Sequence, residues 1–479
     1  MRIHPTARPF QHKSARRVWR FVAAALVPAL LAAGLHAQPE GEVSDGAIAD
    51  AFFFLATGDT TQRSTALELI ESTFEPGYVA PLLEVVRVSE DPEQRLELLN
   101  LIGAKTGAGH GYDIEAWYQW LWASDPPMIS YYPEVKAALY GGYDKRFLRY
   151  FHSDLPTRVR LSEIRWGGVA RDGIPPLRFP LTESGAEADW LANSDVVFGV
   201  VVNGEARAYP QRILGWHELV MDRFGDTEIT GVYCPLCGTM LAYHSELDGT
   251  LHRLGTSGFL YRSNKLMYDW KTSSLWNSYW GEPVVGPLAN SGIKLQRIPV
   301  TTTSWSAWKA KHPNTSVVAL PSRFDRDYRE GMAYREYLAS TGTMFGIPVR
   351  DSRLTPKHKV LGISPVGTTG TPVAIDLETL QPRQLYWMGP ESDRVLVTDA
   401  ASAGRVYAVE QHRFVEWNGV DTLVDADGGS WSLTEAALVG PNAERLLRVP
   451  ASESFWFGWI NAYPQTELLD SAQLNPADS

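Results

Sequence analysis

Apolar residues recur at helical spacing over residues 44–123, near the start of the chain. The first segment carries them at Ala47, Ala51, Phe52 and Leu55, and three later segments repeat the spacing. The last segment stops before Gly107, a residue type that commonly follows a helix end. Short helices in succession are typical of helical repeats, in which each pair buries its apolar face on the next. The pattern predicts a helical domain here, followed by a connecting region over 124–194 rich in proline and glycine.

The pattern changes to that of β-strands after the connecting region. Residues 196–202 are almost all apolar and end at Asn203-Gly204, a pair that favours the tight turn of a β-hairpin. Two further predicted strands, residues 229–233 and 240–244, enclose the segment Cys234-Pro235-Leu236-Cys237-Gly238. The remainder of the chain is therefore expected to be rich in β-strands.

The β-rich part contains two copies of one sequence pattern. One copy reads Trp305-x-x-Trp308 and then His312-Pro313-x-Thr315, and the other reads Trp456-x-x-Trp459 and then Tyr463-Pro464-x-Thr466. We therefore predict a tandem duplication, with a first repeat over 195–320, a linker over 321–358 and a second repeat over 359–470. The fold class predicted for the whole chain is α+β, a helical-repeat-like domain followed by this duplication.

An extension of the alignment toward the N-terminus distinguishes the two repeats. It sets Cys234 and Cys237 opposite Ala400 and Ala403. Residues that both repeats keep are explained most simply by a shared scaffold, whereas sulfur occurs at this turn in the first repeat alone. The chemistry of the chain is therefore expected at its two cysteines.

The first 37 residues have the features of a secretory signal peptide. Basic residues precede an uncharged apolar run over 21–33, and the small residue Ala37 precedes Gln38. An uncleaved anchor is the alternative, but the run is shorter than the roughly 20 residues of a membrane span. No second apolar stretch of spanning length follows. We therefore expect a periplasmic or secreted protein with no membrane span after cleavage of residues 1–37.

Charge and cysteine content narrow the functional classes. The formal net charge of −11 argues against a nucleic-acid partner, because phosphate binding needs a basic surface. The chain has 2 cysteines, which only two residues separate. A disulfide across so short a loop stabilises a fold by only about 2 kcal/mol. The sulfur pair is therefore explained better by chemistry than by stability.

The Cys-x-x-Cys turn has three chemical interpretations. As a dithiol it can cycle with a disulfide, as such pairs do when one thiol pKa is lowered. As a metal site it needs more ligands, because structural zinc has four, and sulfur combined with imidazole and thioether suits copper as well as zinc. The candidate metal ligands are Cys234, Cys237, His217, Met240 and His244. The third interpretation is an inert disulfide bridge.

Residues downstream of the turn are candidates for substrate binding. They are Tyr261, Arg262, Asn264 and Asp269. The first three are polar groups found only in the first repeat. Asp269 corresponds to Asp425 in the second repeat, and a hydrogen bond within a turn or at a strand end would explain both carboxylates.

Several motifs together resemble the DUF3179 family of bacterial exported proteins. They are Gly204-Glu205-Ala206-Arg207-Ala208-Tyr209-Pro210, Leu214-Gly215-Trp216-His217-Glu218, the Cys-Pro-Leu-Cys-Gly turn, residues 264–269 and Ser274-Leu275-Trp276. The resemblance begins near Ile174, runs to the end of the second repeat and leaves the helical segment outside. Some members of that family are named selenoproteins, which implies that a cysteine position can carry selenium and favours redox chemistry. The family has no assigned reaction, so the resemblance implies a fold rather than a substrate.

These observations lead to one functional hypothesis and one alternative. The hypothesis is an exported oxidoreductase or redox sensor that uses Cys234 and Cys237, with a bound soft metal such as copper as a variant. The alternative is a non-redox protein that binds a metal or docks a protein partner through its helical domain.

Overall fold

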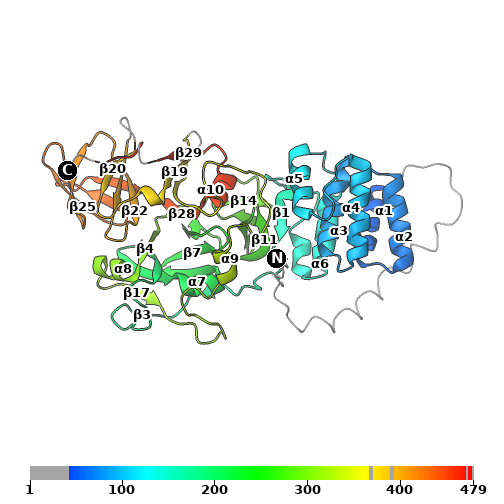
Figure 1. The fold of residues 1–479 in the computed structure, drawn as a ribbon. Helices are drawn as coiled ribbons and strands as arrows, with labels where there is room; N and C mark the ends of the chain where they lie inside the picture. The colour runs from blue at the N-terminus through cyan, green and yellow to red at the C-terminus, as the bar shows by residue number, and fades with distance from the viewer. Residues whose placement is uncertain (1–42, 366–369, 389–392, 471–472, 477–479) are drawn as a thin grey trace, which may run out of the picture.

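The computed structural model describes residues 43–365, 370–388, 393–470 and 473–476. The predicted signal peptide, residues 1–37, lies outside the described residues. Helices form one end of the molecule and β-strands form most of the rest, so the predicted α+β class is confirmed (Figure 1). Among the helices of the described residues, none is both long enough and apolar enough to cross a membrane.

Six α-helices of the described chain form the N-terminal helical domain. They are α1 Asp45–Thr57, α2 Thr60–Ser72, α3 Val79–Val88, α4 Pro92–Thr106, α5 Ile114–Ser124 and α6 Tyr132–Gly141. Ser44, Asp59 and Asp91 cap three of the N-termini, because each side-chain oxygen accepts a backbone N–H of the first turn. Gly107 follows α4 with a φ of +74°, a left-handed conformation that glycine adopts without strain. The capped helices then bury apolar side chains such as Ile102 completely.

The last of these helices lies inside the region that the sequence predicted as a connector. α6 packs on α1 and α3, so the helical domain continues past residue 123. Lys136 of α6 forms a fully buried ion pair with Glu84 of α3. Tyr132 and Tyr140 donate hydrogen bonds to the same carboxylate. Because a buried charge is costly unless it is paired and hydrogen-bonded, this group fixes α6 in one position on α3.

The first half of the β-rich part builds three five-stranded sheets. Their orders are β16-β4-β5-β17-β3, β15-β8-β7-β6-β2 and β1-β11-β12-β13-β14. The strands are β1 Ile164–Trp166, β2 Leu177–Arg178, β3 Thr182–Ser184, β4 Val196–Val202, β5 Glu205–Pro210, β6 Leu219–Phe224, β7 Thr227–Cys234, β8 Thr239–His244, β11 Leu254–Tyr261, β12 Asn264–Asp269, β13 Leu275–Asn277, β14 Glu282–Val285, β15 Arg297–Ile298, β16 Thr301–Ser304 and β17 Ser316–Val318. Helix α7, Gln211–His217, follows β5, and helix α8, Trp305–Lys311, joins β16 to β17. The short strands β9 Glu246–Leu247 and β10 Thr250–Leu251 pair with each other.

The second half of the β-rich part builds two sheets. A four-stranded sheet has the order β28-β18-β19-β29, and a nine-stranded sheet has the order β23-β24-β25-β26-β27-β22-β21-β20-β30. The strands are β18 Lys359–Ile363, β19 Val373–Asp376, β20 Leu385–Trp387, β21 Arg394–Thr398, β22 Gly404–Ala408, β23 Phe414–Trp417, β24 Thr422–Asp425, β25 Ser430–Leu433, β26 Ala437–Val439, β27 Arg445–Val449, β28 Ala451–Phe455, β29 Glu467–Leu469 and β30 Asn475–Pro476. Helix α10, Trp456–Ala462, joins β28 to β29 as α8 joins β16 to β17. Strand β17 runs parallel to β5, and strand β29 runs parallel to β19. The pairs β16–β4, β4–β5, β28–β18 and β18–β19 are antiparallel.

A glycine and a tryptophan pack in the same way in both halves. A Cβ atom added to Gly199 of β4 would lie 2.2 Å from the indole ring of Trp308. A Cβ atom added to Gly362 of β18 would lie 2.2 Å from the ring of Trp459. The second tryptophan of each Trp-x-x-Trp motif therefore packs directly on a strand backbone that only glycine leaves open.

The two halves contact each other through corresponding residues. Arg297 donates to the hydroxyl of Ser452 at 3.2 Å, and Arg448 donates to the hydroxyl of Thr301 at 2.9 Å. Arg297 lies on β15 and Arg448 lies on β27. The next strand in each half carries the hydroxyl residue, Thr301 on β16 and Ser452 on β28, and a Trp-x-x-Trp helix follows that strand. The halves therefore meet face to face, with each one contributing the same kinds of group to the other.

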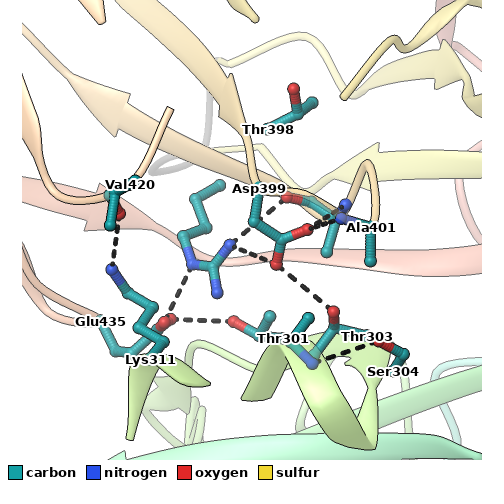
Figure 2. A network of polar contacts seen from close by, with 12 residues as sticks. Thr301, Thr303, Ser304, Lys311, Thr398, Asp399, Ala401, Val420 and Glu435 are labelled. Carbon is teal, nitrogen blue, oxygen red and sulfur yellow. Dashed lines mark hydrogen bonds and ion pairs between the residues drawn. The ribbon is translucent and has the colours of Figure 1, made fainter. Parts of the chain in front are cut away.

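A network of buried charges lies at one of these contacts (Figure 2). The carboxylate of Glu435 accepts hydrogen bonds from Thr301 at 2.8 Å and from Arg405 at 2.9 Å, and it pairs with Arg448. Asp399 pairs with the same Arg405 at 3.1 Å. Because every carboxylate has cationic and hydroxyl donors, the charges are compensated within the interface.

The hairpin that carries the cysteines and the β21–β22 hairpin close in similar ways. Cys234 pairs with Thr239 at the end of β7, and the last pair of β21 and β22 is Thr398 with Gly404. Beyond that pair, the backbone N–H of Asp399 donates to the carbonyl oxygen of Ala403 at 3.2 Å. The predicted alignment of Cys234 with Ala400 stays a prediction.

Alanine substitutions at Gly199 and Gly362 should test the tryptophan packing. We expect each variant to lose about 1–3 kcal/mol of stability, because the added methyl group must displace an indole ring from a filled site. Urea unfolding followed by tryptophan fluorescence measures the effect. Gly109→Ala is the control, since an added Cβ there would meet no heavy atom within 4 Å. An unchanged midpoint in either test variant would contradict the packing.

Candidate functional site

The two cysteines lie at the turn of the β7–β8 hairpin. Cys234 ends β7, and the backbone N–H of Cys237 donates to the carbonyl oxygen of Cys234 at 3.1 Å, which closes the turn. Gly238 is the last residue of the turn, and its φ of +61° lies in the left-handed region. Both cysteines are free, and their Sγ atoms are 3.0 Å apart. The hairpin therefore presents a dithiol whose sulfur atoms need only a small approach to form a bond.

The second half of the β-rich part covers this dithiol. The side chains of Cys234 and Cys237 are only 2% and 0% exposed. The backbone N–H of Phe455 donates to the carbonyl oxygen of Cys237 at 2.7 Å. A Cβ atom added to Gly458 of α10 would lie 3.0 Å from the Cβ atom of Cys237, so the helix backbone itself packs on this residue. The site is built from both halves although only one half carries sulfur.

A second hairpin brings polar groups to the sulfur atoms. Arg262 and Ser263 form the β11–β12 turn with φ values of 49° and 65°, which aims the start of β12 at the cysteines. The side-chain amide of Asn264 donates to Cys237 Sγ at 3.3 Å. The hydroxyl of Ser278 donates in turn to the amide oxygen of Asn264 and so fixes its orientation. Cys237 Sγ also lies 3.5 Å from the carbonyl oxygen of Ser263.

The environment separates the pKa values of the two thiols. Burial raises the pKa of Cys237, and the neighbouring Cys234 raises it further. Burial also acts to raise the pKa of Cys234, but the hydrogen bond from Cys237 together with the charge and backbone N–H of Lys265 lowers it below its usual value. A thiolate is therefore favoured at Cys234, with the proton held on Cys237.

A buried chain of charged and hydroxyl groups continues from the dithiol. Lys265 of β12 forms an ion pair with Glu218. Glu218 directly follows α7 and has a φ of +58°. Tyr334 donates its hydroxyl proton to the other oxygen of the Glu218 carboxylate. Lys265 thus pairs with a carboxylate and also lowers the pKa of Cys234, whereas the negative charge of Glu218 acts to raise that pKa.

The segment predicted as a linker, residues 321–358, closes over the cysteine turn. It contains the short helix α9, Arg335–Ala339. The hydroxyl of Tyr337 donates to the carbonyl oxygen of Leu236, between the two cysteines, at 2.7 Å. This segment therefore belongs to the site and does more than connect the halves.

The three additional metal ligands predicted from the sequence do not assemble at the cysteines. Both ring nitrogens of His217 are engaged elsewhere, at 2.8 Å from the carbonyl oxygen of Pro175 and at 2.7 Å from the hydroxyl of Tyr328. Burial lowers the pKa of His217 to about 4, so its imidazole is neutral. Met240 packs with the apolar cluster on the face of the β7–β8 hairpin opposite to the cysteines. His244 ends β8, about 16 Å along the strand from the turn.

Within the described residues, no group of three or more His, Cys, Asp or Glu side chains could hold a metal ion. The donor set at the dithiol is therefore two sulfur atoms without imidazole or thioether, which is fewer than the four ligands of a structural zinc site.

The four predicted substrate-binding residues have different surroundings. Asn264 contacts the sulfur of Cys237, as described above. Arg262 forms an ion pair with Glu163 at 2.6 Å and donates to the carbonyl oxygen of Asn461, so it joins the first half to α10. Tyr261 packs on Trp280.

Asp269 lies at the far end of β12 from the dithiol. One of its carboxylate oxygens accepts the backbone N–H groups of Lys271 and Thr272 at 2.9 and 2.7 Å. The other carboxylate oxygen lies 3.3 Å from a ring nitrogen of His252. These contacts are the turn hydrogen bonds that the sequence offered as the alternative explanation of this residue.

Sequence reasoning missed Lys265, Glu218, Tyr334 and Tyr337. Glu218 directly follows the predicted ligand His217, and Lys265 directly follows Asn264, so both lay beside residues that were selected. The two tyrosines lie about 100 residues beyond the cysteines in a segment without a periodic pattern, and no local signal marks them.

The fold and the site define an α+β protein with a buried dithiol between two β-rich halves. The chain belongs to the DUF3179 family, whose family model, described as a protein of unknown function, matches residues 171–466. That match includes both halves and the dithiol, and it begins after α6. No curated protein and no solved structure matches the chain.

Replacement of Lys265 by methionine should raise the pKa of Cys234. The variant keeps the backbone N–H but removes the positive charge that favours the thiolate, so we expect the pKa of Cys234 to rise. Alkylation of Cys234 by iodoacetamide, followed against pH in a Cys237→Ser background, measures the midpoint. The rate should fall near neutral pH and recover at high pH.

Lys359→Met provides a matched control, because Lys359 is an exposed lysine on β18 of the second half. A midpoint that stays constant in Lys265→Met, or that moves equally in the control, would contradict the assignment.

Proposed function

We propose that this protein is an exported thiol–disulfide redox protein whose reactive group is the Cys234–Cys237 dithiol. The observation that carries the proposal is the pair of free sulfur atoms 3.0 Å apart, with pKa values shifted in opposite directions. A pair that served only as a staple would gain nothing from a lysine beside one sulfur. Thiol–disulfide exchange instead requires one thiolate as nucleophile and one nearby thiol that can resolve the intermediate.

The proposed exchange proceeds in two steps. The thiolate of Cys234 attacks one sulfur of a substrate disulfide, forms a mixed disulfide and releases the other substrate sulfur as a thiolate. Cys237 then loses its proton to that thiolate and attacks Cys234 Sγ, which releases the second substrate thiolate. The substrate disulfide gains two electrons, and the protein dithiol is oxidised to the Cys234–Cys237 disulfide. The reverse sequence would oxidise a substrate dithiol.

The tandem duplication is part of this proposal. The two halves share strand order, strand direction, the Gly–Trp contact and the reciprocal arginine–hydroxyl contacts. We infer that they are two copies of one unit and that the first copy alone carries the redox chemistry. The second copy then acts as the cover that buries the dithiol through Phe455 and Gly458.

Redox titration of the purified mature chain tests the dithiol. We expect two thiols to become one disulfide with a loss of two hydrogen atoms, at a potential above about −300 mV, the range of exchangeable rather than structural disulfides. Cys237→Ser should accumulate a mixed disulfide with glutathione at Cys234, because the resolving thiol is gone. Mass spectrometry and thiol counting give both readouts.

Two outcomes would contradict this redox assignment. One is a dithiol that stays reduced across the accessible potential range. The other is a stoichiometric copper or zinc ion that is lost in the Cys234→Ser, Cys237→Ser double variant, which would favour a metal site. Met240→Leu is the matched control, because it removes a predicted thioether ligand and leaves both thiols in place.

Export is the second part of the proposal. A dithiol that exchanges with disulfides suits an oxidising compartment such as the periplasm. The basic residues and apolar run before Ala37 support a cleaved signal. We expect the protein recovered from a native periplasmic fraction to begin at Gln38, as N-terminal sequencing or intact mass can establish. Recovery of the uncleaved chain from the cytoplasmic fraction would contradict export.

A further inference from the structure

The sulfur atoms have almost no exposed surface, so something must move before they meet a substrate. Residues 334–357, which we term the covering segment, lie over the cysteine turn. Ile347 of this segment belongs to the same buried apolar cluster as Cys234 and Cys237. Tyr337 contacts the turn between the two cysteines through its hydroxyl group, at 2.7 Å from the Leu236 carbonyl oxygen. Of the parts of the site, the covering segment is therefore the one that most resembles a lid.

Side chains, rather than a strand ladder, hold the covering segment in place. It contains the short helix α9 and no strand, and the structure describes it throughout. Gln119 of α5 donates to the carbonyl oxygen of Ile347 at 2.7 Å, and the amide of Asn461 bonds both backbone groups of Val349 at 3.0 and 2.9 Å. Near its end, the backbone N–H of Phe457 donates to Pro356 at 2.9 Å. Segments with few backbone hydrogen bonds open at a lower free-energy cost than paired strands.

The covering segment is also connected to the charges beside Cys234. Tyr334 has a φ of +58°, an uncommon conformation for a tyrosine, and its hydroxyl binds Glu218. The other oxygen of Glu218 holds Lys265, the lysine that favours the Cys234 thiolate. The hydrogen bond from Tyr334 stabilises the negative charge of the Glu218 carboxylate. Glu218 then attracts Lys265 less strongly, and the positive charge of Lys265 acts more strongly on the sulfur of Cys234.

We propose that the covering segment is a gate that must lift before the dithiol reacts, and that Tyr334 is a positioning residue that ties gate closure to the charge balance at Cys234. This inference rests on the proposed redox function and specifies its regulation. Lifting the gate would expose both sulfur atoms and would free the Glu218 carboxylate to hold Lys265 more strongly. In the closed state the thiolate depends on Lys265, because burial by itself opposes it. The open state exposes the sulfur to solvent and to an alkylating reagent.

The other titratable groups around Cys234 remain neutral in the working pH range. Burial raises the pKa of Tyr233, Tyr279 and Tyr337, and it does the same for Tyr334. The Cys237 pKa is raised as well. Lys265 and Glu218 are therefore the charged pair that faces Cys234, and the coupling should act through them.

Alkylation of the mature full-length chain with N-ethylmaleimide tests the gate, with modification of Cys234 followed by mass spectrometry against pH. Tyr337→Phe and Tyr334→Phe each remove one hydroxyl hydrogen bond from the closed state. We expect each to raise the plateau rate at high pH about fivefold, the population change that corresponds to one typical hydrogen bond. Only Tyr334→Phe should also move the pH midpoint upward, because Tyr337 contacts a backbone carbonyl and no charge.

Tyr386→Phe is the matched control, since the Tyr386 hydroxyl accepts one backbone hydrogen bond at 2.8 Å in the second half, away from the dithiol. An equal rise in this control, or unchanged plateau rates in both test variants, would overturn the gate. A midpoint that does not move in Tyr334→Phe would overturn the coupling.

The urea dependence of the alkylation rate separates local from global opening. A gate predicts a rate that rises far less steeply with urea than global unfolding does, and equal slopes would overturn the gate. Alkylation requires no redox chemistry. A dithiol that alkylates as described but fails the redox titration would therefore disprove the proposed function and leave the gate intact.

Discussion

One backbone hydrogen bond, from the N–H of Phe455 to the carbonyl oxygen of Cys237, joins the two β-rich halves at the sulfur pair. It brings α10 so close that a Cβ atom added to Gly458 would lie 3.0 Å from the Cβ atom of Cys237. Burial of the thiols follows from that approach, and burial in turn makes the few polar contacts decisive, because a charge in a water-poor site depends on its immediate neighbours. The hydrogen bond from Cys237 and the charge of Lys265 can therefore favour a thiolate at Cys234 that burial alone would oppose.

The interface between the halves has two places with different chemistry. At one face, a cysteine turn meets α10. At the other, Asp399 in the turn after β21 meets Thr303 of β16, and the buried charges belong to Arg405, Arg448 and Glu435. Figure 2 shows Asp399 and Glu435 of this cluster beside Thr301 and Thr303. A compensated ion cluster costs little once formed but is difficult to open, because separated charges would remain buried. The sulfur atoms are held by weaker hydrogen bonds, with each other and from the amide of Asn264. The sulfur face is therefore the one suited to a reaction that needs access.

Much of the helical domain and of the β-rich region could be predicted from the sequence because the signals are local. Apolar spacing marks the helices over residues 44–123, and the apolar run over 196–202 before Asn203-Gly204 marks the β4–β5 hairpin. Helix α6 escaped prediction because prolines and glycines surround it, and its position depends on the Lys136–Glu84 ion pair with a distant helix. The packing of the segment over residues 321–358 on the cysteine turn also escaped prediction, because the Tyr337 contact with Leu236 joins residues far apart in the chain.

The residue types along the chain already show which atoms are available for chemistry. Two cysteines separated by two residues lie close together when the segment forms a turn, and Asn264 at the start of β12 was among the predicted substrate-binding residues. The groups that act on the sulfur atoms depend on how distant segments pack. Lys265, Glu218 and Tyr334 come from three separate segments, and His217 and Met240 lie near the turn in the chain but direct their side chains into other contacts. The physical reason is that a pKa depends on distances through space and on exclusion of water, and neither quantity follows from spacing along the chain.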